Sequence, residues 1–350
     1  MDTRLAYEGY VRRKRLFAAA LAALTVAVAV AALCAGSSGL GLGDLAAALA
    51  GKASRRVSVV LFNIRLPRVV TAVVAGAGLA SAGLAMQGIL KNPLASASTL
   101  GISQGAAFGA SFAIVALGAG LQNQSLDGVT ILNPYLVSAC AFACSMLSTG
   151  IVLGLSRLRR ATPESMVLSG VALSTLFAGG TTLLQYFAAD VKVAAVVFWS
   201  FGDLGRTSWR EIAVMSVVVA LSLAYHLAKR WNYNALQSGE DQAKGLGVNV
   251  ERSRLVGMLV SSLAAAVVVS YVGIINFIGL VAPHIARRFV GGDYRYLLPA
   301  SALTGALLLL LADTAARLVV APVILPIGAI TSFLGAPLFL YLLFRRKGTS

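Results

Sequence analysis

The stretch LFAAALAALTVAVAVAALCAG, from Leu16 to Gly36, runs for 21 residues without a charged side chain. A helix needs about 20 consecutive apolar residues to cross the hydrocarbon core of a bilayer. Four basic residues, Arg12 to Arg15, come directly before this stretch. A cleavable signal peptide has a shorter apolar core that ends at a small-residue cleavage site. We therefore expect a first membrane helix that is retained.

The composition extends this interpretation to the whole chain. Its 350 residues are 58% apolar and 12% charged, whereas soluble domains are typically about 45–50% apolar and about 25% charged. Such a chain has room for about ten crossings joined by short loops. We expect an all-α, polytopic membrane protein of about ten transmembrane helices, with a single transmembrane domain over residues 1–350. The expected spans are 16–36, 67–89, 98–118, 133–155, 164–187, 211–229, 255–274, 274–290, 296–316 and 328–344.

Basic residues orient these spans, because cytoplasmic loops of membrane proteins are enriched in Lys and Arg. With the N-terminal tail, residues 1–15, placed inside, the inner segments hold 20 of the 29 Lys and Arg and the outer segments hold nine. Both termini are then cytoplasmic, in a multi-pass protein of the inner (plasma) membrane. The net charge of +16 fits this topology and contact with anionic membrane lipid. No nucleic-acid partner is expected, because no soluble module offers a basic face.

Residues that carry catalysis or hold metals are sparse in this sequence. The three cysteines lie in apolar stretches, where packing is their expected role, and His226 and His284 have no partner spaced to complete a metal site. No paired carboxylates and no nucleophile with a base point to a membrane enzyme. The chain also lacks G-x-x-x-x-G-K-[ST], so it cannot bind ATP through a P-loop. We expect no catalytic residue, no metal site and no cofactor bound by this chain.

Four ordered segments stand out from the apolar background. The first contains Arg65-Leu66-Pro67-Arg68, QGILKNPL at 87–94 and LGIS at 100–103. The second, in the longest inner loop, contains Ser238-Gly239-Glu240, Ala243 and Leu246-Gly247-Val248. The third contains GLVAPHIAR at 279–287, GDYR at 292–295, Asp313 and Arg317. The fourth contains LPIG at 325–328 and GAPLF at 335–339.

This ordered set closely resembles the FecCD-type permeases, which include the transmembrane subunits of ABC importers for ferric siderophores, haem and cobalamin. The resemblance covers roughly residues 16–346. It implies the BtuC-like fold of type II ABC importer permeases and a homodimer around a central path. It also implies two cytoplasmic ATPase subunits, which hold the ATP and Mg²⁺, and an extracytoplasmic substrate-binding protein on the outer face. The chain would then be a transport subunit and not an enzyme.

The substrate implied by the resemblance is a metal chelate, with ferric siderophore as first choice, haem as second and cobalamin as third. The different-class alternative is a secondary transporter driven by an ion gradient. Such proteins usually keep ionisable residues near the bilayer midplane. Here the acidic residues nearest to spans all fall near span ends, which favours an external energy source. They are Glu164, Asp190, Asp203 and Asp313.

Three arginines are placed on the outer side, where the insertion rule disfavours them. Arg65, Arg68 and Arg317 match positions at which the family receives acidic residues of the binding protein, so the resemblance implies docking there. Two alternatives stay open. The arginines could pair with lipid head groups, or Arg317 could pair with Asp313 one helical turn earlier.

The inner loop at about 230–254 has an expected role of its own. Its apolar positions alternate with charged ones, which suits a short interfacial helix ending at Gly245 or Gly247. By resemblance this is the coupling helix that contacts the ATPase, and the alternative is an ordinary solvated loop. The residues assigned to coupling are Gly239, Glu240, Ala243, Leu246, Gly247 and Val248.

The inner end of the second span carries the expected cytoplasmic gate. The resemblance places a narrowing of the path at Asn92 and Leu94, and an apolar collar can block a solute by excluding water. Alternatively, Asn92 could simply cap the next helix, ahead of a proline at the first helical position. On the outer side, the segment from Trp199 to Trp209, together with Phe198, is expected to be an aromatic anchor at the membrane interface that could also border the substrate mouth.

Overall fold

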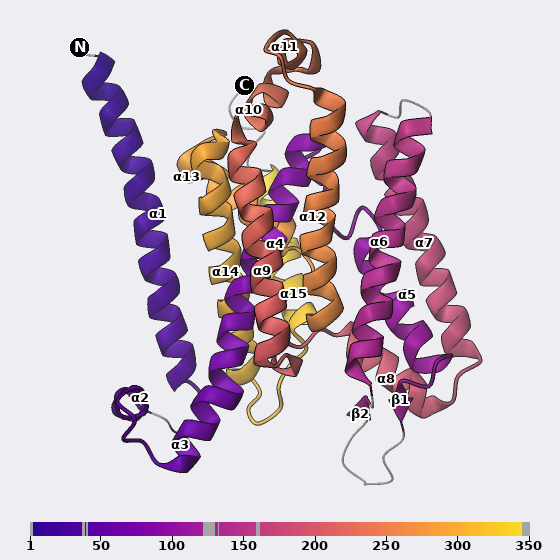
Figure 1. Cartoon of the computed structure of the whole chain (residues 1–350). Helices are drawn as coiled ribbons and strands as arrows, with labels where there is room; N and C mark the ends of the chain where they lie inside the picture. The colour runs from indigo at the N-terminus through magenta and orange to yellow at the C-terminus, as the bar shows by residue number, and fades with distance from the viewer. Residues whose placement is uncertain are drawn as a thin grey trace.

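The computed structural model describes residues 3–36, 39, 41–121, 130–131, 133–158 and 162–344, which form a bundle of long helices (Figure 1). Ten of these helices coincide with the expected spans. They are α1 (Thr3–Cys34), α4 (Leu66–Ile89), α5 (Ile102–Val115), α6 (Pro134–Leu158), α7 (Pro163–Tyr186), α9 (Trp209–Ala228), α12 (Val250–Val272), α13 (Ile278–Val290), α14 (Tyr294–Leu318) and α15 (Ile327–Phe344).

Short elements connect the long helices. The short helices are α2 (Leu42–Leu49), α3 (Arg55–Val59), α8 (Asp190–Ser200), α10 (Arg230–Ser238) and α11 (Glu240–Gly245). The remaining elements are the π-helical turn η1 (Val60–Arg65), the 3-10 turn η2 (Leu204–Arg206) and an antiparallel hairpin of β1 (Gly120–Leu121) and β2 (Thr130–Ile131).

The lengths of the helices support the membrane assignment. Seven stretches in the described part of the chain are helical, long and apolar enough to cross a bilayer. Helices α5 and α15 are shorter but apolar, and α13 has 13 residues with Arg287 and Arg288 in its last turn. The predicted all-α, polytopic membrane fold is confirmed. The polar tail expected before the first span is itself helical from Thr3 onward, as the first turns of α1.

The bundle has two distinct ends in Figure 1. The α11 end, at the top of the picture, carries α10, α11 and the start of α1. The α8 end, at the bottom, carries α2, α3, α8 and the β1–β2 hairpin. The predicted cytoplasmic side corresponds to the α11 end, because the expected inner loop contains α11. The predicted outer side corresponds to the α8 end.

Helix α4 forms the centre of the bundle and packs against α9, α12, α13 and α14. Small residues permit this close approach. A Cβ atom on Gly76 would lie 2.3 Å from the carbonyl oxygen of Gly305 in α14, and one on Gly83 would lie 1.9 Å from that of Gly279 in α13. Both neighbours are backbone atoms, which cannot move aside as a flexible side chain can. These two positions therefore require glycine.

The helix that contains α4 begins earlier than expected. Residues Arg55–Ile89 form one helical stretch, in which η1 ends just before Leu66 and Pro67, the first residues of α4. Proline lacks the N–H that would bond to the carbonyl four residues earlier, and a wider π turn is a common local adjustment in such helices. The charges of Arg65 and Arg68, which suggested a boundary, lie inside this long helix.

Helices α5, α6 and α7 form a second group beside the α4 core, with α5 packed against both α6 and α7 (Figure 1). Helix α7 leaves much of its apolar surface uncovered, including the exposed side chains of Leu168, Leu176 and Leu183. Exposed apolar surface of this extent is expected to face lipid or another subunit.

Candidate functional site

The three arginines predicted for docking converge at the α8 end. Asp313 of α14 is completely buried and accepts hydrogen bonds from two of them. Its Oδ1 accepts from Nε of Arg68 at 2.8 Å, and its Oδ2 accepts from Nε of Arg317 at 3.1 Å. Asp203, between α8 and η2, adds a weaker ion pair, with its Oδ1 3.5 Å from Nη2 of Arg68. One buried carboxylate thus joins α4 to α14.

Arg65 and Arg317 also donate hydrogen bonds to backbone carbonyls at the C-terminal end of α1. Nη1 of Arg65 donates to the carbonyl oxygens of Leu33 at 2.6 Å and Cys34 at 2.9 Å. Arg317 donates through Nη1 to Ala35 and through Nη2 to Ala32, each at 3.2 Å. The last carbonyls of a helix lack intrahelical donors, and cations are stabilising at that end. The cluster therefore fixes the end of α1 on α4 and α14.

These three arginines are largely buried. Arg65 is 6% and Arg68 is 8% exposed, and the side chain of Arg317 is 11% exposed. Their guanidinium groups face inward because Asp313 and the α1 carbonyls offer acceptors inside the fold. The alternative pairing of Arg317 with Asp313 is confirmed. Docking through these residues stays a prediction.

The expected gate residues lie in the turn that follows α4. Asn92 accepts a hydrogen bond through Oδ1 from the backbone N–H of Leu94 at 2.9 Å, and the Leu94 side chain is exposed. The alternative that Asn92 caps the next helix is wrong, because α5 starts only at Ile102, with Gly101 at its N-cap. Asn92 instead stabilises its own turn, as Asn side chains commonly do. The gating role is a prediction that concerns a short exposed loop.

The short helix predicted in the inner loop is present as α11 and ends at Gly245. Gly239 precedes it with φ +129°, and Gly247 follows it with φ +79°, both in the region that favours glycine. Ala243 is fully buried against the bundle, whereas Leu246 is 73% exposed and Val248 is half-buried. Leu246, the residue that follows α11, is thus open to contact with another protein.

Glu240, the first residue of α11, lies between two cations. Its Oε1 accepts from Nη2 of Arg254 in α12 at 2.5 Å and lies 3.8 Å from Nζ of Lys91, at the end of α4. Glu240, which is assigned to coupling, thus contacts Lys91, which directly precedes the predicted gate residue Asn92. This contact could not be read from the sequence.

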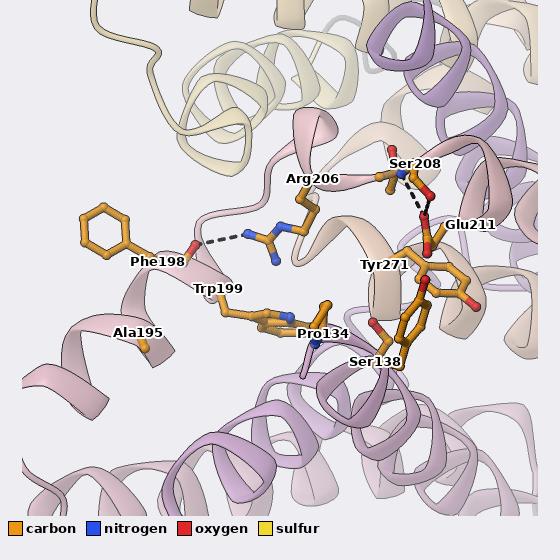
Figure 2. A pocket seen from close by; sticks show the side chains of 11 residues that line it. Pro134, Ser138, Ala195, Phe198, Trp199, Arg206, Ser208, Glu211 and Tyr271 are labelled. Atoms are coloured by element: carbon orange, nitrogen blue, oxygen red, sulfur yellow. Dashed lines mark hydrogen bonds between the residues drawn. The ribbon is translucent and has the colours of Figure 1, made fainter. Parts of the chain in front are cut away.

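A pocket of about 500 Å³ opens at the α8 end, between α6, α8, α9 and α12 (Figure 2). The guanidinium of Arg206 reaches over the Trp199 ring, 6.0 Å from its centroid, and donates to the Phe198 carbonyl oxygen at 3.3 Å. Across the pocket, the backbone N–H of Ser208 donates to Glu211 at 2.8 Å. Phe198 and Trp209 are exposed, so the aromatic anchor stays a prediction for these two side chains, whereas Trp199 is buried. Its indole instead forms a wall of this pocket.

The two histidines are used in packing and hydrogen bonding. Ser261 donates its hydroxyl proton to the carbonyl oxygen of Gly257, so it accepts from Nε2 of His226 at 3.2 Å. Nδ1 of His226 therefore accepts from Tyr233 at 2.8 Å. Burial raises the pKa of Tyr233, which keeps the phenol protonated. His284 Nδ1 donates to the Leu280 carbonyl oxygen. Among the described residues, no three His, Cys, Asp or Glu side chains are grouped to hold a metal.

Comparison with known proteins agrees with this geometry. The profile of the FecCD transport family matches residues 23–345. A Methanocaldococcus jannaschii protein named "Putative ABC transporter permease protein" is 50% identical over 99% of both chains. The "Hemin transport system permease protein HmuU" of Yersinia pestis is 40% identical over 81% of this chain and 83% of its own. The structure titled "An inward-facing conformation of a putative metal-chelate type ABC transporter" is 30% identical, with a TM-score of 0.82 over 94% of this chain and 98% of the other.

Proposed function

Because this chain belongs to the FecCD transport family and is a membrane permease of metal-chelate ABC importers, we propose that it carries a ferric siderophore across the inner membrane. The observation that carries this proposal is the family match over residues 23–345, joined to a bundle whose ten long helices follow the expected spans. Relatives are named for haemin, Fe(3+)-citrate, Fe(3+)-hydroxamate and cobalamin transport. Two of these four names specify iron, as do those of two Helicobacter pylori relatives named for iron chelatin transport, which supports an iron chelate.

Haem is the second candidate substrate, because the relative that is 40% identical is named for hemin transport. A direct competition test separates the two. The permease is reconstituted with its ATPase and binding protein in proteoliposomes, and uptake of ⁵⁵Fe-siderophore is measured with excess haemin or cobalamin. We expect neither competitor to reduce siderophore uptake. If the proteoliposomes take up haemin or cobalamin but not the siderophore, that compound is the substrate.

A homodimer is the proposed assembly. The uncovered apolar faces of α7 and α15 support it, since Leu176 of α7 and Phe333 of α15 are both highly exposed. Two copies could cover part of these faces and enclose a path between them, as obligate interfaces are more apolar than the general surface. The remaining apolar surface would face membrane lipid.

The proposed energy source is a pair of cytoplasmic ATPase subunits that bind ATP and Mg²⁺. The chain has no P-loop of its own, and α11 presents Leu246 at the predicted cytoplasmic end. We propose that the ATPase binds α11 there and that movement of α11 is passed to the membrane helices.

A substrate-binding protein is proposed to dock at the α8 end. Arg65, Arg68 and Arg317 remain the predicted contacts. An acidic residue of the binding protein must then compete with Asp313 and with the α1 carbonyls for the same guanidinium groups. Docking through these arginines would therefore loosen the contacts between α1, α4 and α14.

A further inference from the structure

Lys91 occupies an unusual backbone position. It follows Leu90, the C-cap of α4, and has φ +47°, although it is not glycine. Its N–H donates to the Gly88 carbonyl oxygen, and the N–H of Asn92 donates to that of Gln87. These two bonds define a Schellman ending, in which the left-handed residue is usually glycine. A lysine here adopts a backbone conformation that costs free energy for any residue with a Cβ.

The charged side chain of Lys91 makes a contact that glycine could not make. Its ammonium lies 3.8 Å from the carboxylate of Glu240, the first residue of α11. Glycine would relieve the backbone but would remove this contact. The pair is partly exposed, with 37% of the Lys91 and 34% of the Glu240 side chain accessible. Pairs of this kind add little to stability, so stability alone does not explain a lysine at a glycine position.

Glu240 is also anchored from a second side. Arg254 of α12 donates to the same Oε1 at 2.5 Å, and its side chain is only 14% exposed. One carboxylate therefore connects three elements: α11, α12 and the turn after α4. Any displacement of α11 relative to α12 changes the position of the carboxylate that holds Lys91.

The turn held by Lys91 is the predicted gate. Asn92 follows Lys91 directly, and its side chain accepts from the backbone of Leu94. We infer that Glu240 and Lys91 form a positioning pair, through which a movement of α11 shifts the turn from Asn92 to Leu94. The inference rests on the proposed function, because it assumes that the ATPase moves α11. Before α11 moves, the contact with Arg254 fixes the position of the Glu240 carboxylate.

The test uses Lys91→Gly in the full complex of permease, ATPase and binding protein. Glycine fits φ +47° without strain, so the thermal midpoint of the detergent-solubilised complex should not fall. We expect the number of chelates transported per ATP hydrolysed to fall at least about fivefold, the lower end of typical coupling effects. The matched variant Lys91→Arg keeps the charge, and its ratio of chelates transported to ATP hydrolysed should stay close to that of wild type. Glu240→Lys, which places three cations together, should uncouple hydrolysis from transport as well.

Two results would overturn the inference. One is a Lys91→Gly complex with the wild-type ratio of transport to hydrolysis. The other is equal loss of that ratio in Lys91→Gly and Lys91→Arg, since the charge would then be irrelevant. Failure of the proposed function is distinguishable, because the wild-type complex would then show no ATP-driven uptake of any chelate.

Discussion

Arg68 in the first turn of α4 donates from Nε to Oδ1 of Asp313 in α14, over 2.8 Å, although 245 residues separate them in the sequence. Arg317 takes the other oxygen of the same carboxylate. Asp313 is therefore the counter-ion of two arginines in a site that excludes water. A buried charge of this kind depends on all its partners.

Replacing Asp313 by Asn should destabilise the protein strongly. Arg317 would lose the carboxylate at 3.1 Å, and Arg68 would keep only the longer pair with the half-exposed Asp203. Breaking a buried ion pair typically costs about 3–5 kcal/mol. The matched control is Asp203→Asn, because Asp203 is 45% exposed and lies 3.5 Å from Arg68. An exposed pair contributes about 0.2–1 kcal/mol. Thermal unfolding of the solubilised protein measures both variants, and equal midpoints for the two would contradict the assigned role of Asp313.

The double variant Arg65→Glu with Arg68→Glu tests docking. We expect strongly reduced uptake, because an acidic residue of the binding protein would meet like charges, which slows association. A carboxylate at position 68 would also face the buried Asp313, so the thermal midpoint of the double variant should fall as well. Acid-to-base substitutions on the binding protein should partly restore uptake. The control Lys52→Glu reverses an exposed charge at the same end of the bundle, and it should change association only slightly. Unaltered docking of the double variant at low and moderate salt would remove these arginines from the docking site.

Gly83→Ala should disturb the contact between α4 and α13. The added methyl group would meet the Gly279 carbonyl oxygen at 1.9 Å, and overpacking of this kind costs about 1–3 kcal/mol. Gly150→Ala in α6 is the control, because a Cβ there has no neighbour within 4 Å. That variant should be neutral or stabilising, since glycine inside a helix is less stable than alanine by about 0.5–1 kcal/mol. Comparable yields of folded protein from both variants would argue against the close packing.

Orientation can be tested by cysteine labelling in a background without Cys34, Cys140 and Cys144. A cysteine at Gln242 in α11 should react only from the cytoplasmic side, and one at Lys52 only from outside, as the distribution of Lys and Arg predicts. Positions in the basic groups at Arg159 to Arg160 and Arg345 to Lys347, predicted to be inside, lie outside the described residues. Labelling of the Lys52 position from the cytoplasm would reverse the topology.

The helical framework could be predicted because it depends on local composition. Apolar runs of spanning length located the ten long helices, although α1 begins at Thr3 and the helix leading into α4 begins at Arg55, well before the expected starts. Thr162-Pro163 marked the start of α7, where Thr162 accepts from Ser165. The short helix α11 was also predictable, from the alternation of apolar and charged positions before Gly245. These signals act over one or two helical turns.

The site depended on contacts that no local pattern encodes. The burial of Arg65 and Arg68 could not be predicted, because their acceptors on α1 and α14 are distant in sequence. The contact of Lys91 with Glu240 joins the turn after α4 to the start of α11, about 150 residues further along the chain. Trp199 was expected at the lipid interface, but α8, too short to span a bilayer, turns it into the bundle.

The most direct measurement of the central claim is chelate uptake by proteoliposomes that contain the permease, its ATPase and its binding protein. Uptake of a ferric siderophore should require ATP and Mg²⁺ and should continue after ionophores abolish every ion gradient. Uptake that proceeds without ATP and stops with the ionophores would contradict an ATP-driven importer and identify an ion-coupled transporter.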